Sequence, residues 1–536
     1  MTDLHDTLPP LEGNFNLCEY FLDSNLEAGR THKTALICGG ETRTYGQVAE
    51  RARRVAGALR LAGVRAEERV LIVLPDGFAF AESFFGVLRA GAVFAMVNPL
   101  LKRGDFEHYL EYAKPRVVIT HKDVLPELAE VARESRFVEA VFVVDALDEV
   151  DARGFSPYEE VIGTEGALSS GYLEPTGPDD LAGWLFTSGS TGHPKACVHT
   201  HADFRWSTET YAKQVARYKE SDICLSVPKL FFGYATGTNL MFPFAVGATA
   251  VLFPGRSTED ELFDHIGNFG VTFLTNVPTM INKMLNSPRC EGADLGSLRV
   301  CLSAGEALPG SLYTAWMERT GVEILDGIGS AEMFHIYISG YPGRVRTGSL
   351  GNLVPGYEVE IVNADNSVVA PGEVGRLRVR GGSTSICYWA DKKKSRETFQ
   401  GDWCTTGDLF RADDEGYFYY EGRADDLLKV SGIFVSPLEI EDAMLMHPSV
   451  AEVCIVGFEE DDLTKPFAFV VLKNNHAGNE EMAAELKAHL QGRLAPYKYP
   501  RWFEWCDELP KNDRGKIDRK ELKARLETGS PGSVTP

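Results

Sequence analysis

The sequence lacks several patterns that define whole classes of proteins. Its ten cysteines are scattered from Cys18 to Cys506 and none forms a CxxC pair, which favours reduced thiols over a disulfide framework or a zinc site. Positive charge is scarce as well: the net charge of −23 at pH 7 argues against a nucleic-acid-binding surface, and no Lys/Arg block indicates an anionic membrane. We therefore expect no nucleic-acid partner and no membrane partner.

Long hydrophobic runs are also missing. The most apolar stretch, residues 78–100, is interrupted by Glu82, Arg89 and Asn98 and falls short of the ~20 clean residues that a membrane span needs. The beginning of the chain, MTDLHDTLPPLEG, is acidic and has no apolar core, so it does not resemble a signal peptide. These features predict a cytoplasmic protein.

What the chain does contain is an alternation of helical and strand patterns over 536 residues, a length that predicts at least two domains. Apolar residues at positions 48, 52, 55 and 59 follow helical spacing, with arginines between them. Short β-rich runs such as ERVLIVLP, RVVIT, EAVFVVD, ATAVLF and VTFLTNVP are separated by helix-like stretches such as FAFAESFFGVLRAG. Strands that alternate with helices predict largely parallel sheets covered on both faces.

The pattern changes after about residue 349. YEVEIVN, GRLRVRG and GYFYYEGR alternate apolar and polar residues and are separated by Gly/Asp turns, which predicts a small antiparallel subdomain. After GRADD the chain returns to a mixed α/β pattern long enough for a separate domain. We predict an N-terminal domain over residues 1–424, with its β subdomain at about 350–424, and a C-terminal domain over 425–536.

One stretch, FTSGSTGHPKACVHTH at residues 186–201, is unusually rich in glycine and hydroxyl side chains and carries Lys195. It is not a Walker A loop, because Gly189 and Gly192 stand only three apart and Pro194 precedes the lysine. A solvated turn is one reading. The other is a cradle for phosphate oxygens, favoured by the strand-like LAGWLF before it and by the many N–H and O–H donors beside a cation.

The same stretch is the first of six segments that together resemble the adenylate-forming superfamily of acyl- and aryl-CoA synthetases, luciferases and adenylation domains. The segments occur in the family's order between about residues 40 and 525: TSGSTGHPK, LSAGEALP, DGIGSAEM, WCTTGDLF, GRADDLLKVSGIFVSPLEIE and LPKNDRGKIDRK. The resemblance implies an α/β fold, with a large N-terminal domain of stacked α/β sheets that includes a small antiparallel β subdomain. It also implies a small, mobile α+β C-terminal domain.

The resemblance further assigns roles to single residues. It implies three catalytic residues, Lys195, Glu332 and Lys516, of which Glu332 would hold Mg²⁺ through ATP and Lys516 would reach the substrate carboxylate. Asp425 would be the hinge of the C-terminal domain, and Gly432 would border the tunnel for the CoA thiol. The implied ATP- and AMP-binding residues are Thr187, Ser188, Gly189, Ser190, Thr191, Gly192, Gly305, Glu306, Ala307, Asp326, Gly327, Ile328, Asp408 and Arg423.

A further segment, VPKLFFGYATGTNLMFPF at residues 227–244, resembles the acid-binding segment of benzoate-type aryl-CoA ligases. This resemblance places five residues in an acid pocket: Gly233, Tyr234, Gly329, His335 and Ile336. The two glycines predict a thin slot for a flat ring. His335 either hydrogen-bonds the acid or a ring substituent, for example an ortho-amino group, or caps a helix end. No aspartate stands where relatives that activate α-amino acids bind the ammonium group.

Two positions depart from the family's usual Tyr-Gly-x-Thr-Glu segment. Ile328 stands where tyrosine stacks on adenine, and Ala331 lacks the hydroxyl of the usual threonine, so the adenylate contacts at both positions are open. Ser330 is a candidate to compensate for the lost hydroxyl.

The residues and resemblances together predict an ATP-dependent aryl-CoA ligase for benzoate or a small substituted benzoate such as 2-aminobenzoate. ATP, Mg²⁺ and coenzyme A as co-substrate would be required, and the protein would be a monomer or a homodimer. One alternative is a freestanding enzyme that loads the aryl group onto a carrier-protein thiol. Another, from a different class, is a non-catalytic nucleotide-binding protein, against which the intact Lys195, Glu332, Asp408 and Lys516 argue.

Overall fold

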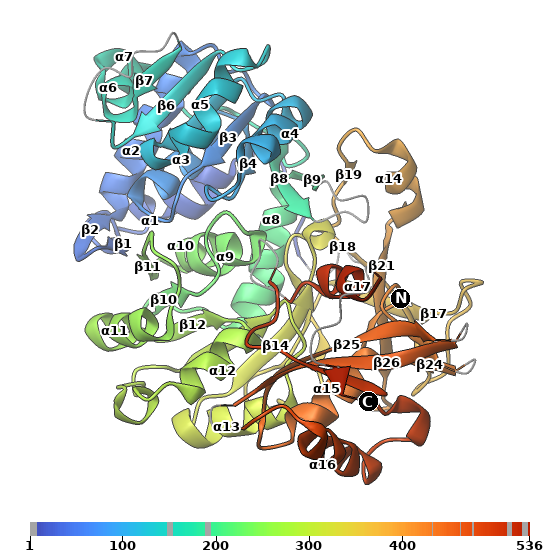
Figure 1. Cartoon of the computed structure of the whole chain (residues 1–536). Coiled ribbons are helices and arrows are strands. Elements are labelled where there is room, and N and C mark those ends of the chain that lie inside the picture. The colour runs from blue at the N-terminus through green and yellow to red at the C-terminus, as the bar shows by residue number, and fades with distance from the viewer. Residues whose placement is uncertain are drawn as a thin grey trace.

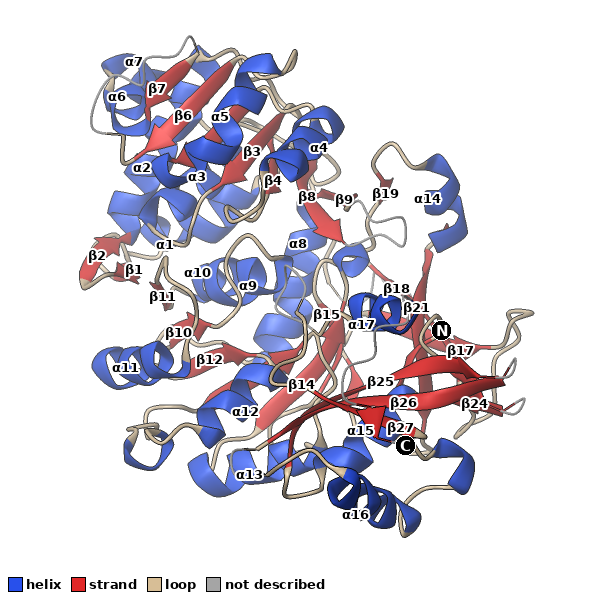
Figure 2. Cartoon of the chain, in the orientation of Figure 1, coloured by secondary structure: helices blue, strands red, loops and turns tan. Residues whose placement is uncertain are grey.

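Figures 1 and 2 show the computed structural model of the chain. The structure describes residues 8–146, 154–187, 194–430, 433–460, 463–473, 476–511, 517–527 and 534–535. Two large mixed sheets and an antiparallel sheet make up the N-terminal part, and a smaller α/β unit follows at the C-terminal end (Figure 2).

The first sheet has the strand order β19-β9-β8-β4-β3-β5-β6-β7, and the pairs from β8 through β7 are parallel. Helices α2 and α3 pack on one face of it, and α4 and α5 pack on the other. The strands are β3 (Arg69–Val73), β4 (Val93–Met96), β5 (Val117–His121), β6 (Ala140–Val144), β7 (Phe155–Pro157), β8 (Leu181–Thr187), β9 (Lys195–Thr200) and β19 (Cys387–Tyr388). The helices are α2 (Tyr45–Leu61), α3 (Phe78–Arg89), α4 (Arg103–Ala113), α5 (Leu125–Glu134), α6 (Tyr158–Gly163), α7 (Glu165–Ser170) and α8 (His201–Ser207).

The second sheet has the order β16-β15-β14-β13-β12-β10-β11-β1-β2, with parallel pairs in its centre and antiparallel pairs at both ends. Its strands are β1 (Thr34–Cys38), β2 (Glu41–Thr44), β10 (Ile223–Ser226), β11 (Thr249–Leu252), β12 (Phe273–Asn276), β13 (Val300–Ala304), β14 (Ile324–Gly329), β15 (Ile336–Ser339) and β16 (Asn352–Leu353). The accompanying helices are α1 (Ser24–Glu27), η4 (Thr208–Ala216), α9 (Gly233–Thr236), η5 (Gly237–Met241), α10 (Phe242–Val246), α11 (Glu259–Phe269), α12 (Pro278–Asn286) and α13 (Gly310–Thr320).

One hydrophobic core joins the two sheets. Val70 and Phe94 of the first sheet belong to the same buried cluster as Ala250 and Phe273 of the second. The opposite face of the second sheet packs against α11, α12 and α13 in a separate core. The shared core therefore fixes the two sheets relative to each other, and the ends of their strands meet at one seam.

The third sheet is the antiparallel one that the alternating pattern predicts. It contains β17 (Tyr357–Val362), β18 (Gly375–Gly381), β20 (Phe399–Gln400), β21 (Trp403–Ala412) and β22 (Phe418–Arg423), with α14 (Lys392–Thr398) beside it. The chain continues into β23 (Leu428–Val430), β24 (Ile433–Val435), α15 (Pro437–Leu445), β25 (Val450–Glu460), β26 (Leu463–Leu472), α16 (Glu480–Gln491), β27 (Trp502–Trp505), α17 (Arg519–Glu527) and β28 (Val534–Thr535). This unit has cores of its own.

Most elements coincide with the sequence patterns. The predicted amphipathic helix is α2, in which Val48, Ala52, Val55 and Leu59 are fully buried and Thr44 forms a capping box with Gln47. The run LAGWLF is the buried strand β8. All ten cysteines are free thiols, and in the part of the chain that is described no helix is long and apolar enough to span a bilayer.

Candidate active site

A continuous cleft of about 2610 Å³ opens along the seam between the sheets and extends to the C-terminal unit. Seventeen of the predicted residues lie in its walls: Thr187, Lys195, Gly233, Tyr234, Gly305, Glu306, Ala307, Asp326, Gly327, Ile328, Gly329, Glu332, His335, Ile336, Asp408, Arg423 and Asp425. The remaining ones lie outside the described residues: Ser188, Gly189, Ser190, Thr191, Gly192, Gly432 and Lys516. The structure thus brings together every predicted site residue that it describes.

The segment predicted to bind phosphate begins and ends in the paired strands β8 and β9. Thr187 and Lys195 face each other in the antiparallel ladder of β8 and β9, so both of these residues are fixed by strand pairing. The Lys195 side chain is mostly buried, and its Nζ lies 3.7 Å from Oδ2 of Asp391 and 5.5 Å from the ring centre of Tyr388. A cation held in this way is suited to bind phosphate oxygens despite the acidic net charge of the chain.

Glu332 contacts the same tyrosine as this lysine. Its Oε1 accepts a 2.6 Å hydrogen bond from the hydroxyl of Tyr388, and its backbone carbonyl accepts one from the N–H of Ser385. The bond to Tyr388 fixes the carboxylate and leaves its second oxygen available to a hard cation, so this residue fits the role of holding Mg²⁺ brought by ATP. Tyr388 and Asp391 were not predicted from the sequence, because each is far from its partner in the chain. Tyr388 is 56 residues from Glu332, and Asp391 is 196 residues from Lys195.

The segment around Gly305 forms another wall of the cleft. Gly305 has φ +91°, a backbone conformation that favours glycine. Oε2 of Glu306 accepts hydrogen bonds from the backbone N–H and the hydroxyl of Thr279, at 3.0 and 2.8 Å, so this carboxylate anchors the segment to the start of α12. On the neighbouring strand β14, Asp326 is almost fully buried, and burial raises the pKa of its carboxyl to about 7.

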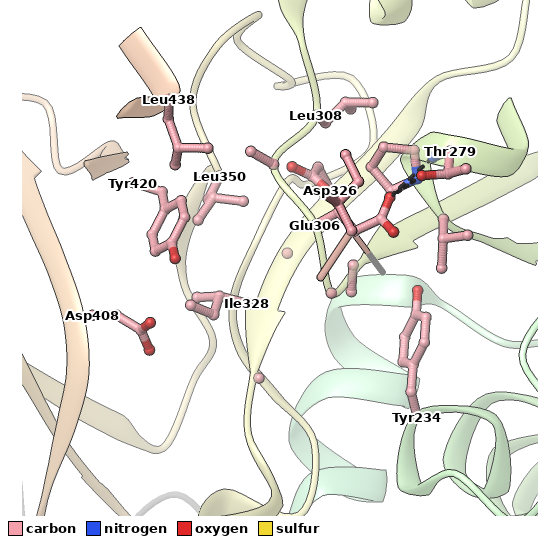
Figure 3. A pocket seen from close by; sticks show the side chains of 18 of the residues that line it. Tyr234, Thr279, Glu306, Leu308, Asp326, Ile328, Leu350, Asp408, Tyr420 and Leu438 are labelled. Atoms are coloured by element: carbon pink, nitrogen blue, oxygen red, sulfur yellow. Dashed lines mark hydrogen bonds between the residues drawn. The ribbon is translucent and has the colours of Figure 1, made fainter. Parts of the chain in front are cut away.

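Asp408 and Arg423 are cross-strand partners in β21 and β22, with Oδ1 and Nη1 3.6 Å apart. Figure 3 shows Tyr420, Leu350, Leu438 and Ile328 close to Asp408 on one side of the cleft, with Asp326, Glu306 and Thr279 on the other. Tyr420 was not predicted, although it lies only three residues before Arg423 in the quoted run GYFYYEGR. It supplies an aromatic ring to this wall of the cleft, which Ile328 cannot do.

At the other end of the cleft, Nε2 of His335 lies 3.2 Å from the carbonyl oxygen of Tyr234. A carbonyl only accepts hydrogen bonds, so Nε2 carries the proton and Nδ1 presents a lone pair. Burial lowers the pKa of His335 to about 3, so the ring is neutral. The ring is enclosed by those of Tyr211, Tyr234 and Phe242. His335 therefore combines a bond to a helix carbonyl with a second nitrogen left for another partner.

The backbone around this histidine is strained. Phe334 has φ +62° although it is not glycine, which costs on the order of 1–3 kcal/mol. A Cβ at Gly237 would lie 2.5 Å from Cδ2 of His335, so glycine there allows the ring to approach the helix. A non-glycine left-handed residue directly before a buried pocket histidine indicates that the position of His335 is functionally constrained.

The glycines of the predicted slot act differently from the expectation. A Cβ at Gly329 would lie 2.5 Å from the carbonyl oxygen of His335, so Gly329 permits close contact between backbone segments and opens no space for a ring. The expectation is wrong for that glycine. A Cβ at Gly233 would lie 3.5 Å from the side chain of Leu185, which is ordinary contact, so the absence of a side chain leaves a small volume there.

The segment 328–332, which departs from the family pattern, is contacted by His199 at the backbone of Ala331. Nε2 of His199 lies 2.7 Å from the carbonyl oxygen of Ala331, and its Nδ1 lies 2.8 Å from Oδ2 of Asp203. Ser330, next to Ala331, has a buried hydroxyl oxygen in the wall of the cleft.

Buried polar atoms in a folded protein are nearly always hydrogen-bonded, so exceptions need an explanation. Among the described residues, six such atoms without a partner belong to the walls of this one cleft; two are Trp184 Nε1 and Glu452 Oε2, and the other four are Tyr234 Oη, Asp326 Oδ1, Ser330 Oγ and His335 Nδ1. These last four lie along its length from the histidine to the segment before Glu332. A polar ligand that fills the cleft would supply the missing partners.

The comparisons with known proteins agree with this geometry. The sequence pattern of AMP-binding enzymes matches residues 24–389, and that of the AMP-binding enzyme C-terminal domain matches residues 439–516. The chain belongs to the AMP-binding enzyme family. It is 39% identical over 531 residues to a benzoate–CoA ligase from Thauera aromatica, which covers 97% of this chain and 98% of the relative.

Solved structures extend the similarity to three dimensions. The chain superposes with a TM-score of 0.93 on an anthranilate CoA ligase, AuaEII, in complex with anthranoyl-AMP, at 36% identity over 99% of this chain and 100% of the other. A benzoate CoA ligase from Burkholderia xenovorans LB400 gives a TM-score of 0.86 at 40% identity, covering 95% of this chain and 99% of the other. The fold is therefore that of the adenylate-forming enzymes, as the sequence motifs predict.

Proposed function

We propose that this chain is an ATP-dependent aryl-CoA ligase that activates benzoate or a small substituted benzoate. The carboxylate attacks the α-phosphorus of ATP, pyrophosphate leaves, and an aryl-AMP mixed anhydride forms. The thiolate of CoA then attacks the acyl carbon, and AMP leaves as the thioester forms. Similarity to aryl-CoA ligases over nearly the whole chain supports both steps, and the single observation that carries the proposal is the row of unpartnered polar atoms in the cleft.

In the first step two anions must approach each other, so the site has to offset their repulsion. We assign Thr187 and Lys195, with Ser188 to Gly192, to the β- and γ-phosphates. Mg²⁺, when bound with ATP, neutralises phosphate charge, and Glu332, oriented by Tyr388, would hold it. The hydroxyl of Ser330 would donate to the adenylate in place of the threonine that Ala331 replaces.

The nucleoside lies, in this proposal, between the Gly305–Ala307 segment and the wall formed by Ile328, Leu350 and Tyr420. Asp408 accepts hydrogen bonds from the ribose hydroxyls, with Arg423 paired beside it. Asp326 Oδ1 is a buried acceptor suited to the exocyclic amino group of adenine. Tyr420 provides the aromatic contact that tyrosine at position 328 would otherwise make.

The acid pocket favours a ring with a hydrogen-bond donor. His335 Nδ1 is a neutral, buried acceptor without a partner, and a site with such an atom binds a substrate that satisfies it better than one that leaves it unpaired. A 2-aminobenzoate supplies this donor and benzoate does not. We therefore propose an amino- or hydroxybenzoate as the preferred acid.

A change of domain pose between the two steps is part of the proposal. Asp425 lies in the turn that follows β22, where the chain passes from the N-terminal part into the C-terminal unit, and it borders the cleft. A boundary at 424/425 would let Lys516 serve the first step and the backbone at Gly432 serve the second. Closure of the C-terminal unit would also exclude water from the anhydride.

The deciding experiment supplies purified protein with ATP, Mg²⁺ and benzoate, hydroxybenzoates, aminobenzoates or short fatty acids. Pyrophosphate release with aryl acids, followed by saturable aryl-CoA formation with free CoA, is expected. Pyrophosphate release without thioester formation, but with loading of a carrier protein, would instead identify a freestanding adenylating enzyme. No pyrophosphate with any acid would leave a non-catalytic nucleotide-binding protein.

The proposal also includes a cytoplasmic location, which the ten free cysteines support because thiols stay reduced there. A monomer or homodimer is proposed, and sedimentation analysis would distinguish the two.

A further inference from the structure

The segment that lines the aryl end of the cleft is anchored by two residues that do not line it. Asp76 follows β3 of the first sheet, and Lys229 follows β10 of the second. Neither is among the residues of the cleft wall, whereas Phe231, Phe232, Gly233 and Tyr234 all are. Lys229 is thus adjacent to the pocket residues in the chain, whereas Asp76 comes from a distant segment, and neither borders the cleft.

Asp76 connects the two sheets through a single hydrogen bond to the backbone. Its side chain is 3% exposed, and Oδ1 accepts the N–H of Leu230 at 2.8 Å. The two residues are 154 positions apart in the sequence. Leu230 is fully buried and directly precedes the two phenylalanines of the wall. Movement of its backbone would therefore move the wall.

Lys229, which directly precedes Leu230 in the chain, restrains the same segment. Its Nζ donates a 2.9 Å hydrogen bond to the carbonyl oxygen of Phe253 and lies 3.2 Å from the centre of the Phe253 ring. Its own carbonyl oxygen accepts the N–H of Phe232 at 2.9 Å, which begins the turn into the pocket. A lysine stem bound at both ends has little freedom, so it restrains the segment at this point.

The two side chains also stabilise each other's charge. Burial raises the pKa of Asp76 to about 7, and the ammonium of Lys229 opposes this rise. Burial likewise lowers the pKa of Lys229 to about 8, and Asp76 opposes that change. Asp76 is buried and Lys229 is half-buried, so removal of the lysine ammonium would leave the Asp76 carboxylate with less compensation for its burial.

A third contact holds the far end of the segment. The hydroxyl of Thr236 donates to the carbonyl oxygen of Leu230 at 2.6 Å and lies 3.8 Å from the sulfur of Met96 in β4. Met96 itself borders the cleft. The segment between Lys229 and Thr236 is therefore tied at both ends, and the first sheet takes part in both ties.

We infer that Asp76 and Lys229 are positioning residues of the acid pocket, which hold the segment from Leu230 to Tyr234 at the place where it contacts the aryl ring. The inference rests on the proposed function, because it takes this end of the cleft as the acid site. The clamp formed by Asp76 and Lys229 acts on the affinity for the acid and on the choice of ring, and it leaves ATP binding unchanged.

The test compares steady-state kinetics of the full-length wild type and four variants with 2-aminobenzoate, benzoate and a bulkier 4-substituted benzoate. In Asp76→Ala we expect KM for the acid to rise about tenfold, while KM for ATP changes less than about twofold. Discrimination against the bulkier ring should also weaken. Asp76→Asn keeps an oxygen that accepts the N–H of Leu230 and should restore KM for the acid.

Lys229→Met keeps the stem and loses the ammonium, so it carries the same expectation as Asp76→Ala and remains decisive if that variant does not fold. Asp222→Ala is the matched control. Asp222 is also buried and also accepts a backbone N–H, from Lys219 at 2.7 Å, but it directly precedes β10, at the end of the strand opposite Lys229. This control should lose stability and keep the wild-type KM for the acid.

Folded Asp76→Ala and Lys229→Met with wild-type KM for every acid would overturn the clamp while leaving the ligase activity in place. Equal increases in KM for acid and ATP, or the same acid defect in Asp222→Ala, would reduce the pair to a general contribution to folding and also overturn it. Absence of turnover in the wild type would overturn both proposals.

Discussion

The hydroxyl of Tyr388 donates a 2.6 Å hydrogen bond to Oε1 of Glu332, and Asp391, three residues further along, lies 3.7 Å from the ammonium of Lys195. A single short segment after β18 therefore contacts both proposed phosphate-site residues. Tyr388 lies in β19, which pairs with β9, and Asp391 follows this strand and caps the start of α14.

Tyr388→Phe tests the first of these contacts. Loss of the hydrogen bond leaves the Glu332 carboxylate less well oriented, so the Mg²⁺ concentration for half-maximal pyrophosphate release should rise by about three- to tenfold. KM for the aryl acid should stay the same. The control is Tyr112→Phe, which removes a 2.6 Å bond to the carbonyl of Trp389 without touching Glu332. An unchanged Mg²⁺ dependence in Tyr388→Phe would contradict the assigned role.

His335→Leu tests the preference for a donor on the ring. Without the Nδ1 acceptor, the ratio of kcat/KM for 2-aminobenzoate to that for benzoate should fall about tenfold, because the amino group then enters the pocket without a partner. This ratio is measured for the wild type and for His335→Leu at the same ATP and CoA concentrations. A ratio equal to that of the wild type would show that Nδ1 does not contact the substituent.

The same histidine makes a pH prediction. Burial lowers the pKa of His335 to about 3, whereas an unfolded histidine titrates near its ordinary value of about 6.5. Between these two values the unfolded chain binds a proton that the folded chain does not, so this residue makes stability fall as pH falls through that window. Chemical denaturation from about pH 7 to 4 should show a smaller loss of stability in His335→Leu than in the wild type. An equal pH slope in both proteins would argue against a neutral buried imidazole.

Tyr420→Ala tests the aromatic contact with the nucleotide. Stacking of a base on an aromatic side chain contributes ~1–3 kcal/mol, so KM for ATP should rise about tenfold or more. Tyr420→Phe keeps the ring and should remain close to the wild type. If the phenylalanine variant shows the same defect as the alanine variant, the hydroxyl and not the ring is the relevant group.

Lys516→Ala tests the division of the two steps. This change should cripple formation of the aryl-adenylate and leave thioester formation from pre-made aryl-AMP and CoA largely intact, because only the first step needs the lysine at the substrate carboxylate. Pyrophosphate exchange and aryl-CoA formation measure the two steps separately. Equal loss in both would show that the assigned role is wrong.

Much of the fold could be predicted because local patterns and burial agree. Residues 45–61 have both the apolar spacing and the capping residues of a helix, and the β-rich runs of the first half are buried strands with no competing pattern. The candidate site could be predicted from its motifs because those residues lie close together in the chain. The sequence reasoning did not foresee partners supplied from far away, such as Asp76 for Leu230 or Tyr388 for Glu332.

Glycine shows a second limit of reading a sequence. Gly329 suggests empty space, yet its missing side chain is explained by the carbonyl oxygen of His335 at 2.5 Å from a built Cβ. Only the packed backbone distinguishes a glycine that makes room for a ligand from one that makes room for the protein itself. The departure at 328 is similar, since Tyr420, the residue proposed to supply the aromatic contact there, is recognised only by its position in the cleft wall, whereas Ser330 is already a candidate from the sequence.

The seam between the two sheets has a consequence for how such enzymes diversify. Because a carboxylate on one sheet binds an amide on the other, the width available to an aromatic ring depends on the relative placement of two large layers as well as on the side chains that touch the ring. Changes in the shared core, remote from any substrate atom, would then be a route by which related enzymes acquire new acids, and libraries aimed at altered selectivity should include that buried boundary.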